Sequence, residues 1–292
     1  MPHGRRSRSV RPFWGEERTV LNTRWKRAAL AGALPLALAL PLPAAAAPAA
    51  QPAPAAQPGP VTAYDDSYYQ PALGKTGEEL KVALNDIIST NDQLTYDQVW
   101  DALKVTDQDP ANPDNVVLLY TGRSQGKDTN GGDADQWNRE HTWAKSHGDF
   151  GTDVGPGTDV HHLRPTDVSV NSERGNKDFD MGGSEVGEAP GNFTDDDSYE
   201  PRDAVKGDVA RMIMYMAVRY EGEDGAPDLE LNDNVDNGEA PLMGRQSVLL
   251  QWNAQDPPDD FERNRNQVIF DQFQHNRNPF VDHPEWAGEI WR

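Results

Sequence analysis

Residues 137–179 read WNREHTWAKSHGDFGTDVGPGTDVHHLRPTDVSVNSERGNKDF and hold four of the seven histidines of the chain. The segment first runs extended up to Glu140 and His141, and then passes through glycine turns at positions 148, 151, 155 and 157. A second extended run covers residues 159–163, and Pro165 followed by Thr166 and Asp167 is a typical start of a helix. The segment therefore predicts a strand, a loop, a second strand and a helix.

This β-β-α order would bring an imidazole, a carboxylate and amide oxygens together. Glu140 and His141 end the first strand, while Asn171 and Arg174 on the helix, and Asn176 beyond it, can point back at that strand. Carboxylate and amide oxygens suit a hard divalent cation such as Mg²⁺, which binds few protein oxygens and keeps several waters. The unit is the first candidate for a functional site.

Two neighbouring histidines follow the glycine turns. His161 and His162 lie on opposite faces if the segment is a strand, so at most one of them faces the site. For either one we expect a packing or supporting role.

Competing motifs are absent from the sequence or incomplete. Glu140–His141 lacks the second histidine of a zincin helix, and the chain has no Gly-x-Ser-x-Gly elbow, phosphate-binding lysine loop or dinucleotide-binding glycine turn. The acidic residues 224–239 resemble a calcium loop, but Val235 occupies a ligand position there, which favours a solvated loop.

The remaining sequence predicts a mostly helical α+β domain spanning residues 64–292. Val116 to Tyr120 is a short apolar run typical of a buried strand. Few other segments have the pattern of a strand. Apolar residues recur at helical spacing in five segments, at residues 76–89, 96–103, 206–220, 246–253 and 263–274.

The N-terminal 63 residues differ in composition from the rest. Residues 1–27 carry eight basic and two acidic side chains, and residues 28–42 are an apolar run too short and too rich in proline to span a membrane well. We expect residues 1–47 to be a cleaved secretory signal peptide, with a membrane anchor as the alternative. Residues 48–63, rich in Pro and Ala, are expected to be a disordered linker.

The charge and the cysteine count exclude several function classes. The chain has 27 Lys and Arg against 48 Asp and Glu, a net charge of −21. A general cationic surface for nucleic acid is therefore excluded, so any contact with a polyanion must be local. Without cysteine, the chain has no thiol nucleophile, zinc–thiolate site or disulfide. The expected local cations are Arg139, Arg164, Arg174 and Lys177.

Four motifs resemble those of endonuclease I, a family of secreted and periplasmic non-specific nucleases with a ββα-metal (His-Me) finger. They lie at residues 137–143 (WNREHTW), 161–165 (HHLRP), 170–176 (VNSERGN) and 276–285 (NRNPFVDHPE). Together with residues 207–211 and 252–257, the resemblance extends over nearly all of the chain after about residue 75. The resemblance implies a mostly helical single domain that contains the finger and a small antiparallel sheet. It also implies metal-dependent hydrolysis of DNA, with RNA as a further substrate, to 5′-phosphate products.

The resemblance assigns roles to four residues. His141 would be the general base, Glu140 and Asn171 the metal ligands, and Arg174 a contact to the phosphate, with Asn176 as the alternative ligand. The ion would be Mg²⁺, with Mn²⁺ or Ca²⁺ as alternatives. DNA or RNA would be the only partner, and the mature protein is expected to be a secreted monomer that does not associate with membranes.

Three alternatives remain open from the sequence. The protein could be an extracellular ribonuclease of the same family, an acidic secreted surface module with a structural metal, or a phosphodiesterase acting on small esters. Incubation with plasmid, RNA and a chromogenic phosphodiester, with Mg²⁺ or with EDTA, separates them.

Overall fold

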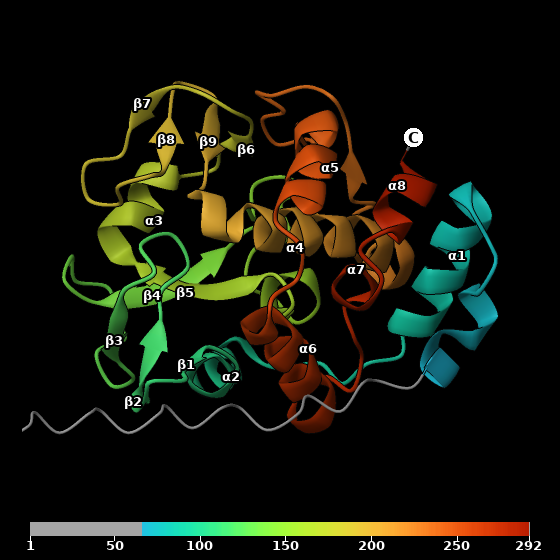
Figure 1. Cartoon of the computed structure of the whole chain (residues 1–292), viewed down its shortest axis with the longest axis horizontal. Coiled ribbons are helices and arrows are strands. Elements are labelled where there is room, and N and C mark those ends of the chain that lie inside the picture. Colours follow the sequence, from blue (N-terminus) through green and yellow to red (C-terminus); the bar gives the residue numbers. More distant parts are fainter. Residues whose placement is uncertain (1–65, 292) are drawn as a thin grey trace, which may run out of the picture. The chain divides into compact units, whose positions relative to one another are not determined.

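Helix α4 (Lys206–Arg219) lies in the middle of the computed structural model, which describes residues 66–291 (Figure 1). Every residue of this helix after Lys206 is buried. Helices α1 (Gly77–Ile88), α5 (Gln246–Gln255) and α7 (Pro279–Asp282) pack against it. The apolar residues at helical spacing in 206–220 are thus part of the core.

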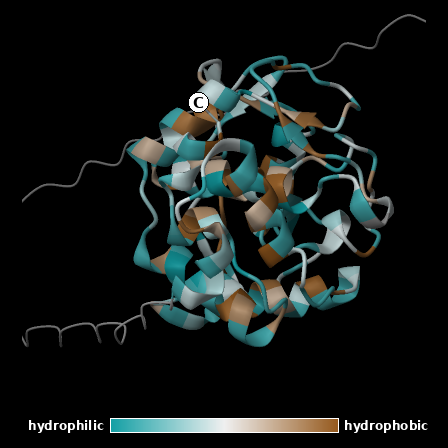
Figure 2. Ribbon diagram, turned by 90° about the vertical axis from the view of Figure 1, so that its right-hand side faces the viewer, coloured by the Kyte–Doolittle hydropathy of each residue, from teal (hydrophilic) through white to brown (hydrophobic). Residues whose placement is uncertain are grey.

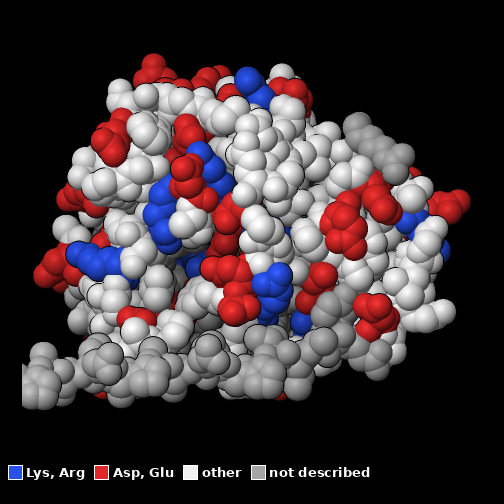
Figure 3. All heavy atoms as spheres, viewed as in Figure 1, with Lys and Arg blue, Asp and Glu red and all other residues white. Residues whose placement is uncertain are grey.

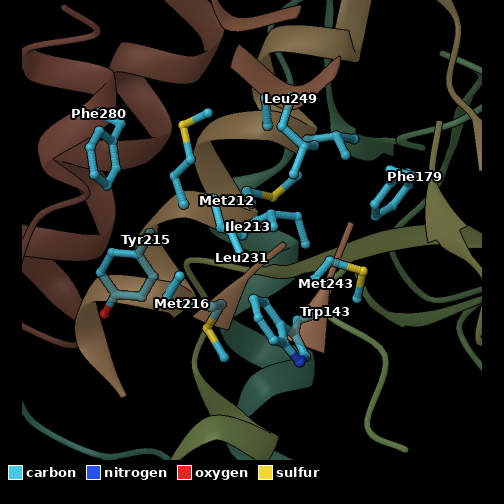
Figure 4. Close-up of a cluster of buried hydrophobic side chains, with 14 of the residues drawn as sticks. Trp143, Phe179, Met212, Ile213, Tyr215, Met216, Leu231, Met243, Leu249 and Phe280 are labelled. Atoms are coloured by element: carbon cyan, nitrogen blue, oxygen red, sulfur yellow. The ribbon is translucent and has the colours of Figure 1, made fainter. Parts of the chain in front are cut away.

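The main apolar core surrounds α4 and draws on segments far apart in the sequence. Figure 4 shows Trp143, Phe179, Met212, Leu249 and Phe280 in this cluster, and each of them is at most 3% exposed. Apolar and hydrophilic residues alternate along most of the outer helices (Figure 2), as expected for helices with one buried face.

A second, smaller core lies between α2 (Tyr96–Thr106), α6 (Asp260–Gln272) and the paired strands β4 and β5. Val99, Leu103, Trp137, Leu163 and Ile269 are fully buried there. This core fixes α2 against the strand that carries Glu140 and His141.

Strand β4 (Trp137–His141) pairs antiparallel with β5 (Leu163–Asp167), and α3 (Val168–Arg174) follows directly. The order expected from the sequence is observed, but the bounds were wrong: the second strand was expected at residues 159–163 and the helix from Pro165. Pro165 lies inside β5 and pairs with Arg139. A proline is tolerated there because β5 has a partner strand on one side only.

The other strands are very short. The strand expected at residues 116–120 is β2 (Asn112–Val117), which starts earlier and ends earlier than expected. One sheet consists of β1 (Gln108–Asp109), β2 and β3 (Ser124–Gly126). A four-stranded sheet has the order β6 (Asp178–Phe179), β9 (Ser198–Glu200), β8 (Phe193–Thr194) and β7 (Ser184–Glu185). Strands β10 (Glu230–Leu231) and β11 (Leu242–Met243) form a parallel pair.

The five predicted helices are all present within a few residues of their expected bounds, as α1, α2, α4, α5 and α6. The remaining helical segments are α8 (Trp286–Ile290) and the 3₁₀ turns η1 (Asp66–Ala72), η2 (Pro156–Thr158), η3 (Asp203–Val205) and η4 (Glu223–Gly225). The predicted signal peptide (1–47) and linker (48–63) lie outside the described residues. Among residues 66–291, no helix has the length and apolar character needed to cross a membrane.

Candidate active site

A pocket of about 390 Å³ opens between α2, β4 and α3. Glu140, His141, Asn171 and Arg174, the four residues singled out from the sequence, all line it. The structure thus brings together residues of a strand and of a helix, such as His141 and Asn171, that lie 30 positions apart in the sequence. The other lining residues are Tyr96, Trp100, Gly131, Asn138, Arg139, Ala144, Lys145, Gly175 and Asn176.

Glu140 is 1% exposed, and one of its two carboxylate oxygens is held by the protein. Tyr120 donates a hydrogen bond of 2.7 Å to Oε1, and Nε of Arg174 lies 3.6 Å from the same atom. Burial raises the pKa of Glu140, while the charge of Arg174 and the bond from Tyr120 oppose that rise. No described group hydrogen-bonds Oε2, which leaves this oxygen available for a ligand.

His141 is oriented by a backbone carbonyl. Its Nε2 lies 3.0 Å from the carbonyl oxygen of Gly157, so the ring proton belongs on Nε2 and Nδ1 keeps a free lone pair. Burial, and then the nearby imidazole of His162, lower the pKa of His141 well below its usual value. The imidazole is therefore neutral at neutral pH.

The loop that supplies this carbonyl depends on glycine. A Cβ atom on Gly157 would lie 2.8 Å from the carbonyl oxygen of Gly151 and 2.9 Å from Cα of Thr152, distances that real Cβ atoms do not adopt. Gly155 has a φ of 118°, a conformation that side chains disfavour. The glycine turns seen in the sequence therefore serve to orient His141.

Asn171 faces the same pocket from α3. Its Nδ2 donates a hydrogen bond of 2.8 Å to Oδ1 of Asn138, which turns its own Oδ1 away from that partner. No described group hydrogen-bonds this Oδ1. Asn176, the alternative ligand, also lines the pocket, but its side chain is exposed.

Arg174 lies in the wall of the pocket rather than free within it. It is 1% exposed, and its Nη1 and Nη2 donate to the carbonyl oxygens of His141 and Thr142 at 3.2 and 2.6 Å. These bonds tie the end of β4 to α3. The geometry favours this holding role over the phosphate contact expected from the sequence.

The expected basic cluster is smaller than the sequence suggested. Arg164 was counted as one of its cations, but it is buried and paired with Asp107 and Asp208 at 2.5 and 3.2 Å. Lys177 donates to Oγ1 of Thr194 at 2.6 Å. Arg139 and Lys145 line the pocket, and neither has an ion pair among the described residues.

His161 and His162 lie in a turn before β5 rather than in the strand that was expected. They still point in different directions. His162 lies against His141, with ring centroids 5.6 Å apart, and its Nε2 is 2.8 Å from the carbonyl oxygen of Pro156. His161 instead lies against the ring of Tyr215, with centroids 4.4 Å apart, and contacts Asn276. His162 is thus the one of the pair that supports the site.

Several side chains at the pocket were missed by sequence reasoning. Tyr120 follows β2, while Tyr96 and Trp100 share one face of α2. Nothing local to these residues indicates a site, because only the tertiary fold brings them next to β4. Lys145, four residues after His141, could have been inferred from proximity in the sequence.

An acidic cluster lies elsewhere, at Glu221, Asp228 and Glu230, whose oxygens are within 4.8 Å of one another. Lys81 reaches two of these carboxylates, Glu221 at 2.7 Å and Glu230 at 2.5 Å. The ammonium group already neutralises much of the cluster. Part of the acidic segment expected to be a solvated loop thus contributes to a lysine ion-pair network.

Among the charged side chains seen in Figure 3, the acidic ones are spread over most of the face. Lysine and arginine side chains gather mainly in a hollow on the side of the molecule where α3 and the sheet β6–β9 lie (Figures 1 and 3). The expectation of a local rather than a general positive surface agrees with this view.

Comparison with known proteins shows the family to which the chain belongs. The endonuclease I family model matches residues 76–285. The chain is 67% identical over 226 residues to the extracellular ribonuclease of Bacillus subtilis (strain 168), an alignment that covers 77% of this chain and 78% of the relative. It is 66% identical over 230 residues to the extracellular ribonuclease of Bacillus amyloliquefaciens, covering 79% and 80%. These likenesses identify the protein as a nuclease, a phosphodiester hydrolase, and set aside the non-enzymatic surface module. The chain belongs to the endonuclease I family.

Proposed function

We propose that the protein is a secreted, metal-dependent endonuclease that hydrolyses RNA and DNA without sequence preference, and that β4, β5 and α3 form its ββα-metal finger. The observation that carries this proposal is the convergence of Glu140, His141 and Asn171 on one pocket. The signal peptide predicted at residues 1–47 would direct the chain out of the cell. The names of the two Bacillus relatives, which include the word extracellular, support this location.

The donor groups in the pocket fit a hard divalent cation. Oε2 of Glu140 and Oδ1 of Asn171 each lack a hydrogen-bond partner among the described residues. One carboxylate oxygen and one amide oxygen, with room for waters, is a donor set suited to Mg²⁺, Mn²⁺ or Ca²⁺. When bound, such an ion would neutralise charge that develops on the phosphoryl oxygens. Glu140 and Asn171 are therefore our proposed metal ligands.

His141 is the proposed general base. Its Nε2 is directed at the carbonyl oxygen of Gly157, so the unprotonated Nδ1 can accept a proton from the attacking water. The lowered pKa of this histidine keeps it in the neutral, proton-accepting form at neutral pH. Attack by water in line with the 3′ oxygen would leave a 5′-phosphate and a 3′-hydroxyl.

Arg174 has a supporting part in this proposal. Its guanidinium group holds the carbonyl oxygens at the end of β4 and lies beside Glu140. It therefore keeps the base and the carboxylate in a fixed relation. Groups that are held in place before substrate binds cost little reorganisation during the reaction.

The proposed hydrolysis does not require a ribose 2′-hydroxyl, because water is the nucleophile. The same chemistry therefore applies to RNA and to DNA. The names of the Bacillus relatives include ribonuclease, which supports RNA as one substrate. No base-reading element is evident at the pocket, so we expect cleavage at many sequences.

The test is incubation of the purified mature chain with RNA, plasmid DNA and a chromogenic phosphodiester, each with Mg²⁺ or with excess EDTA. We expect degradation of both polymers into many fragments with Mg²⁺ and none with EDTA. Full activity in EDTA, or one discrete fragment set from varied substrates, would contradict the proposal. Cleavage of RNA alone would restrict the enzyme to a ribonuclease, and cleavage of the small ester alone would favour a phosphodiesterase.

A further inference from the structure

Arg139 is held against two aromatic side chains at the rim of the pocket. Its guanidinium carbon lies 3.4 Å from the ring centroid of Tyr96 and 4.0 Å from that of Trp100. The rings belong to positions four apart on α2, so they share one face of that helix. Cation–π contacts of this kind hold a guanidinium group in a fixed orientation.

The positive charge of Arg139 is not neutralised by a carboxylate. Its hydrogen-bond partners within residues 66–291 belong to Tyr96, including the backbone carbonyl oxygen of that residue. Asp97 acts on it only through longer-range attraction. A guanidinium group has five N–H donors, and the bonds to the backbone and side chain of Tyr96 engage no more than two of them. Donors therefore remain for an anionic ligand.

Arg139 and Glu140 are neighbours in β4, so their side chains leave the strand on opposite faces. Glu140 is directed towards Tyr120 and Arg174, whereas Arg139 is directed towards α2. The two side chains thus reach the same pocket from different directions, so Arg139 can contact a phosphate other than the one at Glu140 and Asn171. The other pocket arginine, Arg174, is already engaged with backbone carbonyls.

We propose that Arg139, held by Tyr96 and Trp100, forms a second phosphate subsite that binds an internucleotide phosphate next to the one being cleaved. Tyr96 and Trp100 are positioning residues that act through Arg139. The subsite rests on the proposed function and deepens it, because it makes the enzyme prefer polynucleotides over esters that contain a single phosphate.

The first test measures binding in the His141→Ala background, where cleavage of the ligand is expected to be about a hundredfold slower or more. The affinity for a short single-stranded RNA is followed from about 50 to about 200 mM salt in Mg²⁺. We expect Arg139→Gln to weaken binding by roughly tenfold or more at low salt and to reduce the salt slope by about 0.7, the share of one phosphate contact in a single strand. An unchanged slope would overturn the subsite.

Arg263→Gln is the matched control. This arginine is exposed on α6, outside the pocket, and faces Asp260 at 3.9 Å. Its loss changes the net charge by the same amount, and we expect it to leave the slope unchanged. Arg139→Lys should keep the slope but weaken the affinity, since an ammonium group retains the charge and lacks the planar fork.

A double-variant comparison tests the aromatic residues. If Tyr96 acts through Arg139, Tyr96→Leu should weaken RNA binding in the chain with Arg139 and have little further effect when combined with Arg139→Gln. Equal effects in both backgrounds would mean that Tyr96 binds RNA itself or is merely structural, which would overturn its positioning role.

The second test separates the two phosphates, using the chain with His141 intact. Arg139→Gln should lower the ratio of kcat/KM on RNA to kcat/KM on a chromogenic diester with one phosphate by about tenfold. An equal loss on both substrates would place Arg139 at the cleaved phosphate and overturn the proposal. Absence of hydrolysis by the unmodified chain would count against the proposed function alone, because the binding test does not require cleavage.

Discussion

The hydroxyl group of Tyr120 donates a hydrogen bond of 2.7 Å to Oε1 of Glu140, and both side chains are buried. This bond orients the carboxylate so that Oε2 faces the pocket. It also stabilises the ionised form of a group whose burial raises its pKa. Tyr120 is thus the buried partner on which the proposed metal ligand depends.

We therefore expect Tyr120→Phe to weaken divalent metal binding by about tenfold to a hundredfold, as measured by calorimetry, because the carboxylate loses its orienting donor. Tyr199→Phe is the matched control. The ring centroids of Tyr199 and Tyr120 are 4.9 Å apart, and the buried hydroxyl of Tyr199 has no hydrogen-bond partner within residues 66–291. Equal losses in the two variants would show that packing, rather than the bond to Glu140, is responsible.

Base and ligands should be separable by mutation. His141→Ala should reduce the rate of hydrolysis by about a hundredfold or more while Mg²⁺ affinity stays nearly unchanged, because the base contacts water. Glu140→Ala and Asn171→Ala should instead weaken Mg²⁺ binding. Calorimetry and single-turnover rates measure the two effects separately. Loss of Mg²⁺ binding in His141→Ala together with retention in Asn171→Ala would show the assignment to be wrong.

The loop around Gly157 should affect the rate more than metal binding. Gly157→Ala would push the added Cβ against Gly151 and Thr152 and so displace the carbonyl that orients His141. We expect the rate of hydrolysis to fall by about tenfold to a hundredfold with unchanged Mg²⁺ affinity. Gly132→Ala, where nothing lies within 4 Å of the added atom, should leave the rate unchanged. An unaffected rate in Gly157→Ala would argue against this orienting role.

Stability should fall as the pH falls below neutrality. Burial lowers the pKa of His161 and of His162 from 6.5 to about 4. In the unfolded chain both imidazoles take up protons below about pH 6.5, whereas in the folded chain they do not until about pH 4. Their stabilising effect is therefore present above pH 6.5 and is lost as the pH falls towards 4.

From pH 7 to pH 5 we expect each of these histidines to contribute a loss of about 2 kcal/mol in the free energy of unfolding. Denaturant unfolding followed by tryptophan fluorescence measures this loss. His161→Gln should show a smaller loss than the unmodified chain, while His275→Gln, which removes an exposed imidazole, should not. A stability that stays constant from pH 7 to pH 5 would contradict the expectation.

Salt should affect substrate binding only weakly. Few cations line the pocket without an ion pair, and the chain as a whole carries a net charge of −21. For duplex DNA we expect the logarithm of the affinity to fall with the logarithm of the salt concentration with a slope of roughly two to four, measured with His141→Ala. A slope near about ten would indicate an extended basic groove.

The helices were predictable from the sequence, and most of the strands were not. The apolar positions of α1 and α4 recur at helical spacing over twelve residues or more, which is enough for a local signal. Strands such as β6 and β7 have two residues each, too few for any periodic pattern. Their pairing depends on partners that are distant along the chain.

For the site, the sequence by itself supplied the candidate groups: a carboxylate and an imidazole at Glu140–His141, and amides at Asn171 and Asn176. The preference for Asn171 came from the resemblance to the endonuclease I family, in which the metal-binding amide lies six residues after the proline. Only the tertiary structure decided which arginine side chains remain available to bind a phosphate. Arg164 and Arg174 were indistinguishable from Arg139 in the sequence, yet the first two are engaged by carboxylates and carbonyls. Burial and pairing depend on contacts between distant segments, and for that reason the fold alone singles out Arg139, Tyr96 and Tyr120.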